Sequence, residues 1–161
     1  MWNGYSNINR VAKWVEDNLT STPGILLVLN AWQREALSGG RRVFIGGRGC
    51  GKSVAMLSDA IYHAAHGAHV HVIGPSNSRT SALSSVAYVL CSGVASSARD
   101  DAIMFPGGGI LDFWISRLPP GLNPSDLYMD ELDSSQMEAV AHYVRLARNT
   151  WINRRDGCGH T

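Results

Sequence analysis

The chain of 161 residues has the length of one ordinary domain, and 45% of its residues are hydrophobic, which is enough to bury a core. Its formal net charge of +1 excludes a global basic field that would attract nucleic acid, and leaves a local patch or an assembled ring as the routes to DNA. Three cysteines at unrelated spacings argue against a disulfide framework, and the polar first residues argue against a signal peptide. No apolar run is long enough to span a membrane. We therefore expect a cytoplasmic protein without membrane contact.

The periodicity of apolar residues predicts helices that alternate with strands. In chain order, the predicted elements are helices over 7–18 and 29–37, a strand over 42–45, a helix over 52–66, a strand over 69–73, a helix beginning at 76–79, strands over 110–115 and 126–129, and a helix over 134–148. This alternation implies an α/β fold in which a mostly parallel sheet carries helices on both faces. Ligands bind at the carboxyl ends of such strands.

A glycine-rich stretch follows the strand predicted at 42–45. It reads Gly46-Gly47-Arg48-Gly49-Cys50-Gly51-Lys52-Ser53 and fits the phosphate-loop (Walker A) pattern completely. Glycines let backbone N–H groups wrap around phosphate oxygens, and the following helix N-terminus adds partial positive charge. We predict that these eight residues bind the nucleotide, with Lys52 on the β- and γ-phosphates and Ser53 as a ligand of Mg²⁺.

An acidic pair follows the strand predicted at 126–129. Asp130 is predicted to hold Mg²⁺ (Walker B), and Glu131 is predicted to polarise the attacking water. A carboxylate that activates water favours a hydrolase over a nucleotide kinase. The sequence therefore predicts a Mg²⁺-dependent ATPase of the P-loop class, in the branch with an additional strand and a catalytic glutamate.

With these motifs in place, the chain resembles the ATPase domain of phage terminase large subunits, the DNA-packaging motors of tailed phages. The likeness covers about residues 25–138. Four features support the likeness: the loop with Arg48, the aromatic–glutamine pair Trp32-Gln33 about a dozen residues earlier, a strand–Gly-Pro stretch at 72–75, and a Pro-Gly turn before the acidic pair.

The resemblance implies roles for three further residues. Gln33 would hydrogen-bond the adenine edge, and Trp32 would stack on the base or simply pack. Arg48 would reach the γ-phosphate as an arginine finger in cis and join Lys52 and Glu131 as a catalytic residue, or form a surface salt bridge. The implied function is ATP hydrolysis that drives double-stranded DNA into a procapsid, in the cytoplasm of an infected host. The implied partners are DNA, a portal, a small terminase subunit and further copies in a ring.

Terminases continue with a coupling strand, often bearing Ser or Thr, and then a nuclease domain. We see neither before Thr161, and we expect one ATPase domain over 1–161: an adenine-side helical segment at 1–40, a nucleotide-binding core at 41–133, and a helix and tail at 134–161. No nuclease domain and no DNA cleavage are expected. A fragment, a split subunit and a minimal relative all fit.

Two other functions compete. A helicase- or AAA-like DNA-dependent ATPase shares the Trp-Gln element, and a nucleotide-binding assembly or regulatory protein with little turnover is favoured by a missing coupling strand. Outside the motifs, Arg79 is a solvated helix-start arginine or a contact for DNA or a second subunit. The histidines at 63, 66, 69 and 71 show no matching carboxylate set and are interpreted as helix-end and strand residues. The basic residues at 145, 148, 154 and 155 form a solvated face or a DNA path.

Overall fold

The computed structural model describes residues 9–37, 40–46, 51–99 and 101–155. Its elements are α1 (Arg10–Asn18), β1 (Thr20–Thr22), β2 (Ile25–Leu26), α2 (Ala31–Ala36), β3 (Arg41–Gly46), α3 (Lys52–Ala65), β4 (His69–Gly74), α4 (Asn77–Leu90), β5 (Ser97–Ala98), β6 (Ala102–Met104), β7 (Ile110–Ile115), β8 (Asp126–Asp130), α5 (Ser134–Leu146) and β9 (Asn149–Arg155). None of the helices within these ranges is long and apolar enough to cross a membrane.

One large sheet organises the molecule. In the described residues it has seven strands in the order β3-β9-β8-β4-β7-β6-β5. The first five are parallel, and β6 and β5 extend the edge in antiparallel fashion. Strands β1 and β2 form a separate antiparallel pair. The α/β class and the mostly parallel sheet predicted from the sequence are therefore confirmed.

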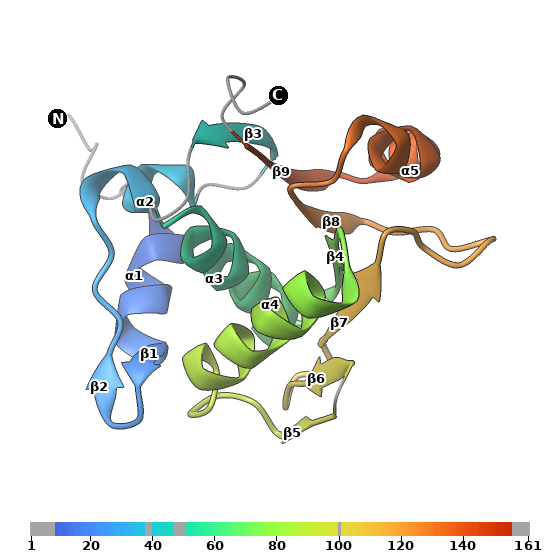
Figure 1. Cartoon of the computed structure of the whole chain (residues 1–161). Coiled ribbons are helices and arrows are strands. Elements are labelled where there is room, and N and C mark those ends of the chain that lie inside the picture. Colours follow the sequence, from blue (N-terminus) through green and yellow to red (C-terminus); the bar gives the residue numbers. More distant parts are fainter. Residues whose placement is uncertain (1–8, 38–39, 47–50, 100, 156–161) are drawn as a thin grey trace, which may run out of the picture.

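Helices cover both faces of this sheet (Figure 1). On one face, α1 to α4 enclose a core that includes Leu57, Val72 and Trp151. On the other, α5 packs through Val140 on a second cluster that includes Ile73. Val72 and Ile73 are neighbours in β4 and enter different clusters, because successive side chains of a strand point to opposite faces. Strand β8 is buried along its whole length, as expected for a parallel strand covered on both sides.

The helix starts follow local capping chemistry. Asn9 accepts hydrogen bonds from the N–H groups of residues 11 and 12 and begins α1. Asn30 with Gln33, and Asp133 with Gln136, form reciprocal capping boxes that begin α2 and α5. Each box fixes where a loop ends and a helix begins, and the second sets α5 directly after the acidic pair.

The C-terminal part differs from the expectation. We expected a helix to Arg148 and no further strand, but α5 ends at Leu146 and the chain returns as β9. This strand pairs with β3 on one side and with β8 on the other, so that Asn153 lies opposite both Phe44 and Asp130. Trp151 is fully buried in it. The prediction that no strand follows the last helix is therefore wrong. The short strands β1, β2, β5 and β6 were not predicted either.

Candidate nucleotide-binding site

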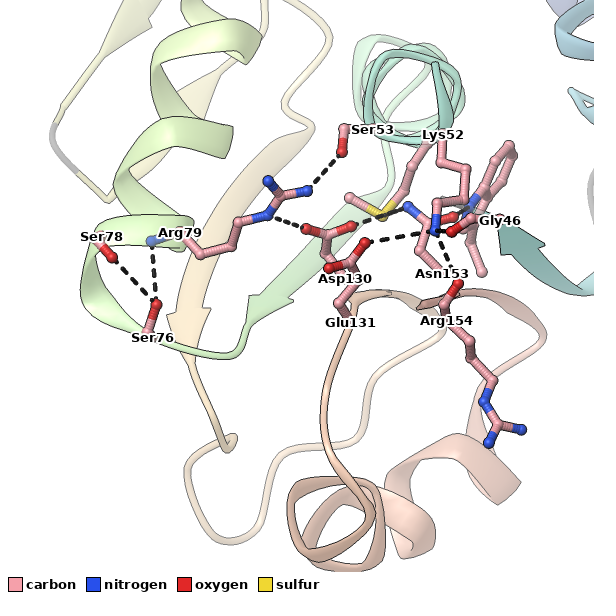
Figure 2. A network of polar contacts seen from close by, with 12 residues as sticks. Gly46, Lys52, Ser53, Ser76, Ser78, Arg79, Asp130, Glu131, Asn153 and Arg154 are labelled. Carbon is pink, nitrogen blue, oxygen red and sulfur yellow. Dashed lines mark hydrogen bonds and ion pairs between the residues drawn. The ribbon is translucent and has the colours of Figure 1, made fainter. Parts of the chain in front are cut away.

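The predicted motif residues gather at one edge of the sheet. Strands β3, β9 and β8 are parallel neighbours, so their carboxyl ends lie together, at Gly46, Arg155 and Asp130. Helix α3 begins at Lys52, after the loop that follows β3. Figure 2 shows Lys52, Ser53, Asp130 and the residue after it at this edge. Gly47, Arg48, Gly49 and Cys50 lie outside the described residues, and the roles predicted for them remain predictions.

Gly51 is required where the loop enters α3. It is the N-cap residue of the helix and has a φ of 85°, in the left-handed region that L side chains rarely adopt. A Cβ at this position would lie 2.5 Å from Nε2 of Gln33. Both the backbone conformation and the close approach of α2 therefore explain the last glycine of the motif.

Lys52 lies at the centre of the site and is 6% exposed. Its ammonium donates to the carbonyl of Gly46 at 2.5 Å and to the carbonyl of Arg154 at 2.8 Å. It also forms an ion pair with Oε2 of Glu131 at 3.4 Å. One buried cation thus connects the ends of β3 and β9 with the residue that follows β8 (Figure 2).

Arg79 joins the two residues predicted to hold Mg²⁺. Its Nε donates to Oδ2 of the fully buried Asp130 at 2.6 Å, and its Nη2 donates to Oγ of Ser53 at 3.0 Å. The hydrogen bond with Asp130, opposed by partial burial, raises the pKa of Arg79 above its usual value. The interpretation of Arg79 as a solvated helix-start arginine is therefore wrong. The Ser53 hydroxyl and the Asp130 carboxylate both bind the same guanidinium. Oxygen ligands placed in this way also fit a hard cation such as Mg²⁺.

Asn153 is a site residue that the sequence did not reveal. Its Nδ2 donates to Oδ1 of Asp130 at 3.1 Å, and its Oδ1 accepts from Nε1 of Trp151 at 2.7 Å. Its carbonyl accepts the backbone N–H of Glu131 at 2.8 Å. An asparagine that ends the run Thr-Trp-Ile was the available signal, but without β9 it had no place in the fold.

Glu131 turns sharply away from the end of β8. Its φ of 56° lies in the left-handed region, which is uncommon for any residue other than glycine. The hydrogen bond to the carbonyl of Asn153 fixes this conformation, and the carboxylate reaches the ammonium of Lys52. Strained backbone of this kind is concentrated at functional sites.

The aromatic–glutamine pair Trp32-Gln33 lies next to the start of α3. Trp32 packs on Phe44, with ring centroids 6.0 Å apart, and the two line a hollow of about 380 Å³. Gln33 donates from Nε2 to the carbonyl of Gly51 at 3.1 Å and accepts the N–H of Asn30 at 3.0 Å. Gln33 therefore ties α2 to the start of α3, and its contact with adenine remains a prediction.

The architecture identifies a mixed α/β protein with a terminase-like fold. A crystal structure of the HK97 bacteriophage large terminase superimposes with a TM-score of 0.67 over 91% of this chain, at 12% sequence identity. The chain spans 37% of the length of that terminase. No protein-family model matches the sequence, and no curated protein matches it. At 12% identity the comparison concerns the fold alone.

Proposed function

We propose that this chain is a Mg²⁺-dependent ATPase module of a terminase-like DNA-packaging motor. The observation that carries the proposal is the convergence of Lys52, Ser53, Asp130 and Glu131 at the carboxyl ends of adjacent parallel strands, with a cationic group held between Ser53 and Asp130. Phosphoryl transfer needs this combination of positioning groups and charge neutralisation, and little covalent chemistry from the protein.

The side chains divide the work as follows. Lys52 exchanges its carbonyl partners for β- and γ-phosphate oxygens, while Ser53 and Asp130 would hold Mg²⁺. When bound, Mg²⁺ neutralises the charge that develops on the phosphoryl oxygens. Glu131 orients the attacking water and accepts its proton. Its ion pair with Lys52, at 3.4 Å, holds its carboxylate beside the start of α3.

Strand β9 supports the motor over an assembly protein with little turnover. It lies between the strand that leads into the phosphate loop and the strand that leads into the acidic pair. It follows the acidic pair in the chain and ends beside the site, as the resemblance to terminases implies for a coupling strand. With a strand present after the acidic pair, its absence no longer argues for little turnover. Double-stranded DNA, a portal, a small terminase subunit and a ring of copies remain parts of the proposal, as do ATP and the adenine contact of Gln33.

ATPase measurements test the proposal. Lys52→Ala and Glu131→Gln should abolish Mg²⁺-dependent turnover, with Glu131→Gln still binding ATP. The matched controls are Lys13→Ala, at the chain's other lysine, and Glu138→Gln, at an exposed glutamate of α5; both should leave the rate unchanged.

The outcomes separate the three functions. Stimulation by double-stranded DNA supports the motor, whereas stimulation by single-stranded DNA alone supports a helicase-like ATPase. ATP binding without turnover supports an assembly or regulatory protein. An ATPase rate that is unchanged in both Lys52→Ala and Glu131→Gln refutes the enzymatic proposal.

A further inference from the structure

Two histidines and an aspartate form a cluster away from the nucleotide-binding site. His69 and His71 are two residues apart in β4, so their side chains leave the same face of the sheet. Asp112 lies in the neighbouring strand β7, directly opposite His71 in the register. Val70 and Leu111, which flank these residues, belong to the core under α3 and α4. The cluster therefore lies on the face covered by α5, towards the amino ends of the strands, whereas the phosphate site lies at their carboxyl ends.

The three side chains already point at one another. Nε2 of His69 lies 2.7 Å from Oδ2 of Asp112, and Nδ1 of His71 lies 2.5 Å from Oδ1 of the same carboxylate. All three groups offer a donor atom within 4.8 Å of the others. The two imidazole rings lie side by side, with centroids 4.4 Å apart. His71 is 2% exposed and His69 51%, so the cluster is anchored in the protein and open to solvent on one side.

A fourth residue orients the carboxylate of Asp112. Nε1 of Trp114 donates to Oδ1 at 2.8 Å and holds the carboxylate in place. A residue behind a ligand that fixes its orientation in this way is typical of metal centres.

We propose that His69, His71 and Asp112 bind a divalent transition-metal ion, with Zn²⁺ as the best fit. Two imidazole nitrogens and one carboxylate oxygen are ligands that suit Zn²⁺, and Mg²⁺ prefers oxygen alone. Bonds of about 2.0–2.1 Å in a tetrahedral site hold ligand atoms roughly 3.3 Å apart. The two histidine–carboxylate pairs, at 2.7 and 2.5 Å, therefore need to open by less than about 1 Å to admit the ion. The open side at His69 leaves a position for water. The ion joins β4 to β7, and its binding does not depend on the function proposed above.

Metal titration of the full-length chain tests this site. After removal of metal with a chelator, Zn²⁺ binding is measured by calorimetry and Co²⁺ binding by visible absorption. We expect one ion per chain at this site and a higher thermal unfolding temperature with Zn²⁺. His69→Gln and Asp112→Asn should weaken binding at least about tenfold and remove the rise in unfolding temperature, because even the partners behind a ligand change affinity about 10–100-fold.

Matched variants keep the outcome clear. His142→Gln removes an exposed histidine of α5, and Cys158→Ser removes a thiol near the end of the sequence; both should bind Zn²⁺ like the wild type. His69 is half exposed, so His69→Gln leaves the core closed, and circular dichroism checks the fold of each variant. Millimolar Mg²⁺ should not compete. No binding by the wild type, equal binding by His69→Gln and Asp112→Asn, or displacement by Mg²⁺ would overturn the proposal and leave a cluster held by hydrogen bonds alone.

Discussion

Arg79 and Asp130 form an ion pair, 2.6 Å from Nε to Oδ2, although they are 51 residues apart in the sequence. The same guanidinium donates to Ser53, so one cationic side chain engages both residues predicted to hold Mg²⁺. Arg79 thus places a positive charge against the buried carboxylate of Asp130.

Arg79→Gln should raise the affinity of the nucleotide-free protein for Mg²⁺ or Mn²⁺. The arginine competes for Asp130 and Ser53, and a partly exposed ion pair is worth about 0.2–1 kcal/mol, so the gain should reach up to about fivefold. Titration of the protein with Mn²⁺, followed by the decrease of the free Mn²⁺ signal in electron paramagnetic resonance, measures the affinity. Arg99→Gln, at an exposed arginine outside the site, is the control. An unchanged or weaker affinity in Arg79→Gln would contradict the prediction.

Asn153 is predicted to be a positioning residue. Asn153→Ala removes one donor from Asp130 and the acceptor of Trp151, and a buried group left unsatisfied costs about 1–3 kcal/mol. If the proposed function holds, we expect kcat of ATP hydrolysis to fall more than the affinity for ATP, because the acidic pair is misplaced while the predicted phosphate loop is unchanged. Steady-state kinetics and nucleotide binding measure the two effects.

Thr150→Val is the control for Asn153→Ala, since Thr150 is also buried in β9 but lies towards the other end of the strand. If Thr150→Val and Asn153→Ala lower kcat equally, the effect belongs to the strand as a whole and the role assigned to Asn153 is incorrect.

Asp59 is predicted to be essential for stability. This fully buried residue of α3 accepts hydrogen bonds from Arg42 at 3.0 Å and from the hydroxyl of Tyr128. Asp59→Ala leaves the Arg42 charge buried without its carboxylate, which costs about 3–5 kcal/mol. Urea denaturation gives the change in unfolding free energy. Asp17→Ala, which removes the exposed ion pair with Lys13, is the control, and it should lower the unfolding free energy by less than about 1 kcal/mol. A similar small cost for both variants would refute the prediction.

Cys91 should make the protein sensitive to alkaline pH. Burial raises the pKa of its thiol from 9.0 to about 11. Below pH 9 the thiol is protonated in both the folded and the unfolded chain, so its contribution to the stability of the fold is fully present. As pH rises from 9 towards 11 the unfolded chain loses its proton first, and roughly 2–3 kcal/mol of stability is lost.

Cys91→Ala isolates this effect, because the substitution changes packing by a constant amount at every pH. The difference in unfolding free energy between wild type and Cys91→Ala, measured from pH 7 to 11, should therefore shift in favour of the variant above pH 9. A difference that stays flat across this range would show that the thiol ionises equally in both states.

Most of the fold could be predicted because its signals are local. The helices α3, α4 and α5 and the strands β3, β4, β7 and β8 all lie where apolar periodicity indicated them. Strand β9 was not predicted because its apolar run is only Trp151 and Ile152, which lie between polar and basic residues. Its buried Asn153 is hydrogen-bonded to Asp130 from the neighbouring strand, and a sequence pattern shows polarity but not the partner that compensates it.

The histidine cluster shows the same limit. From the sequence, His69 and His71 are interpreted as strand residues, because no matching set of cysteines or carboxylates is visible. Asp112 comes from the next strand of the sheet, and only the register of β4 with β7 brings it to the two rings. An argument from spacing cannot detect a donor that is supplied across a parallel strand pair, since the connection between such strands is long.

By itself, the sequence determined the α/β class, the Gly-Lys-Ser segment at the start of α3 and the acidic pair at the end of β8, since each depends on residues that are adjacent in the chain. Only the tertiary structure decided which groups meet them. Arg79, Asn153 and the carbonyl of Arg154 reach Asp130 and Lys52 because five parallel strands bring their carboxyl ends to one edge. The phosphate loop is predicted from eight consecutive letters. The contacts around Lys52 and Asp130 required the fold, because side-chain contacts over long sequence separations arise from strand order and register.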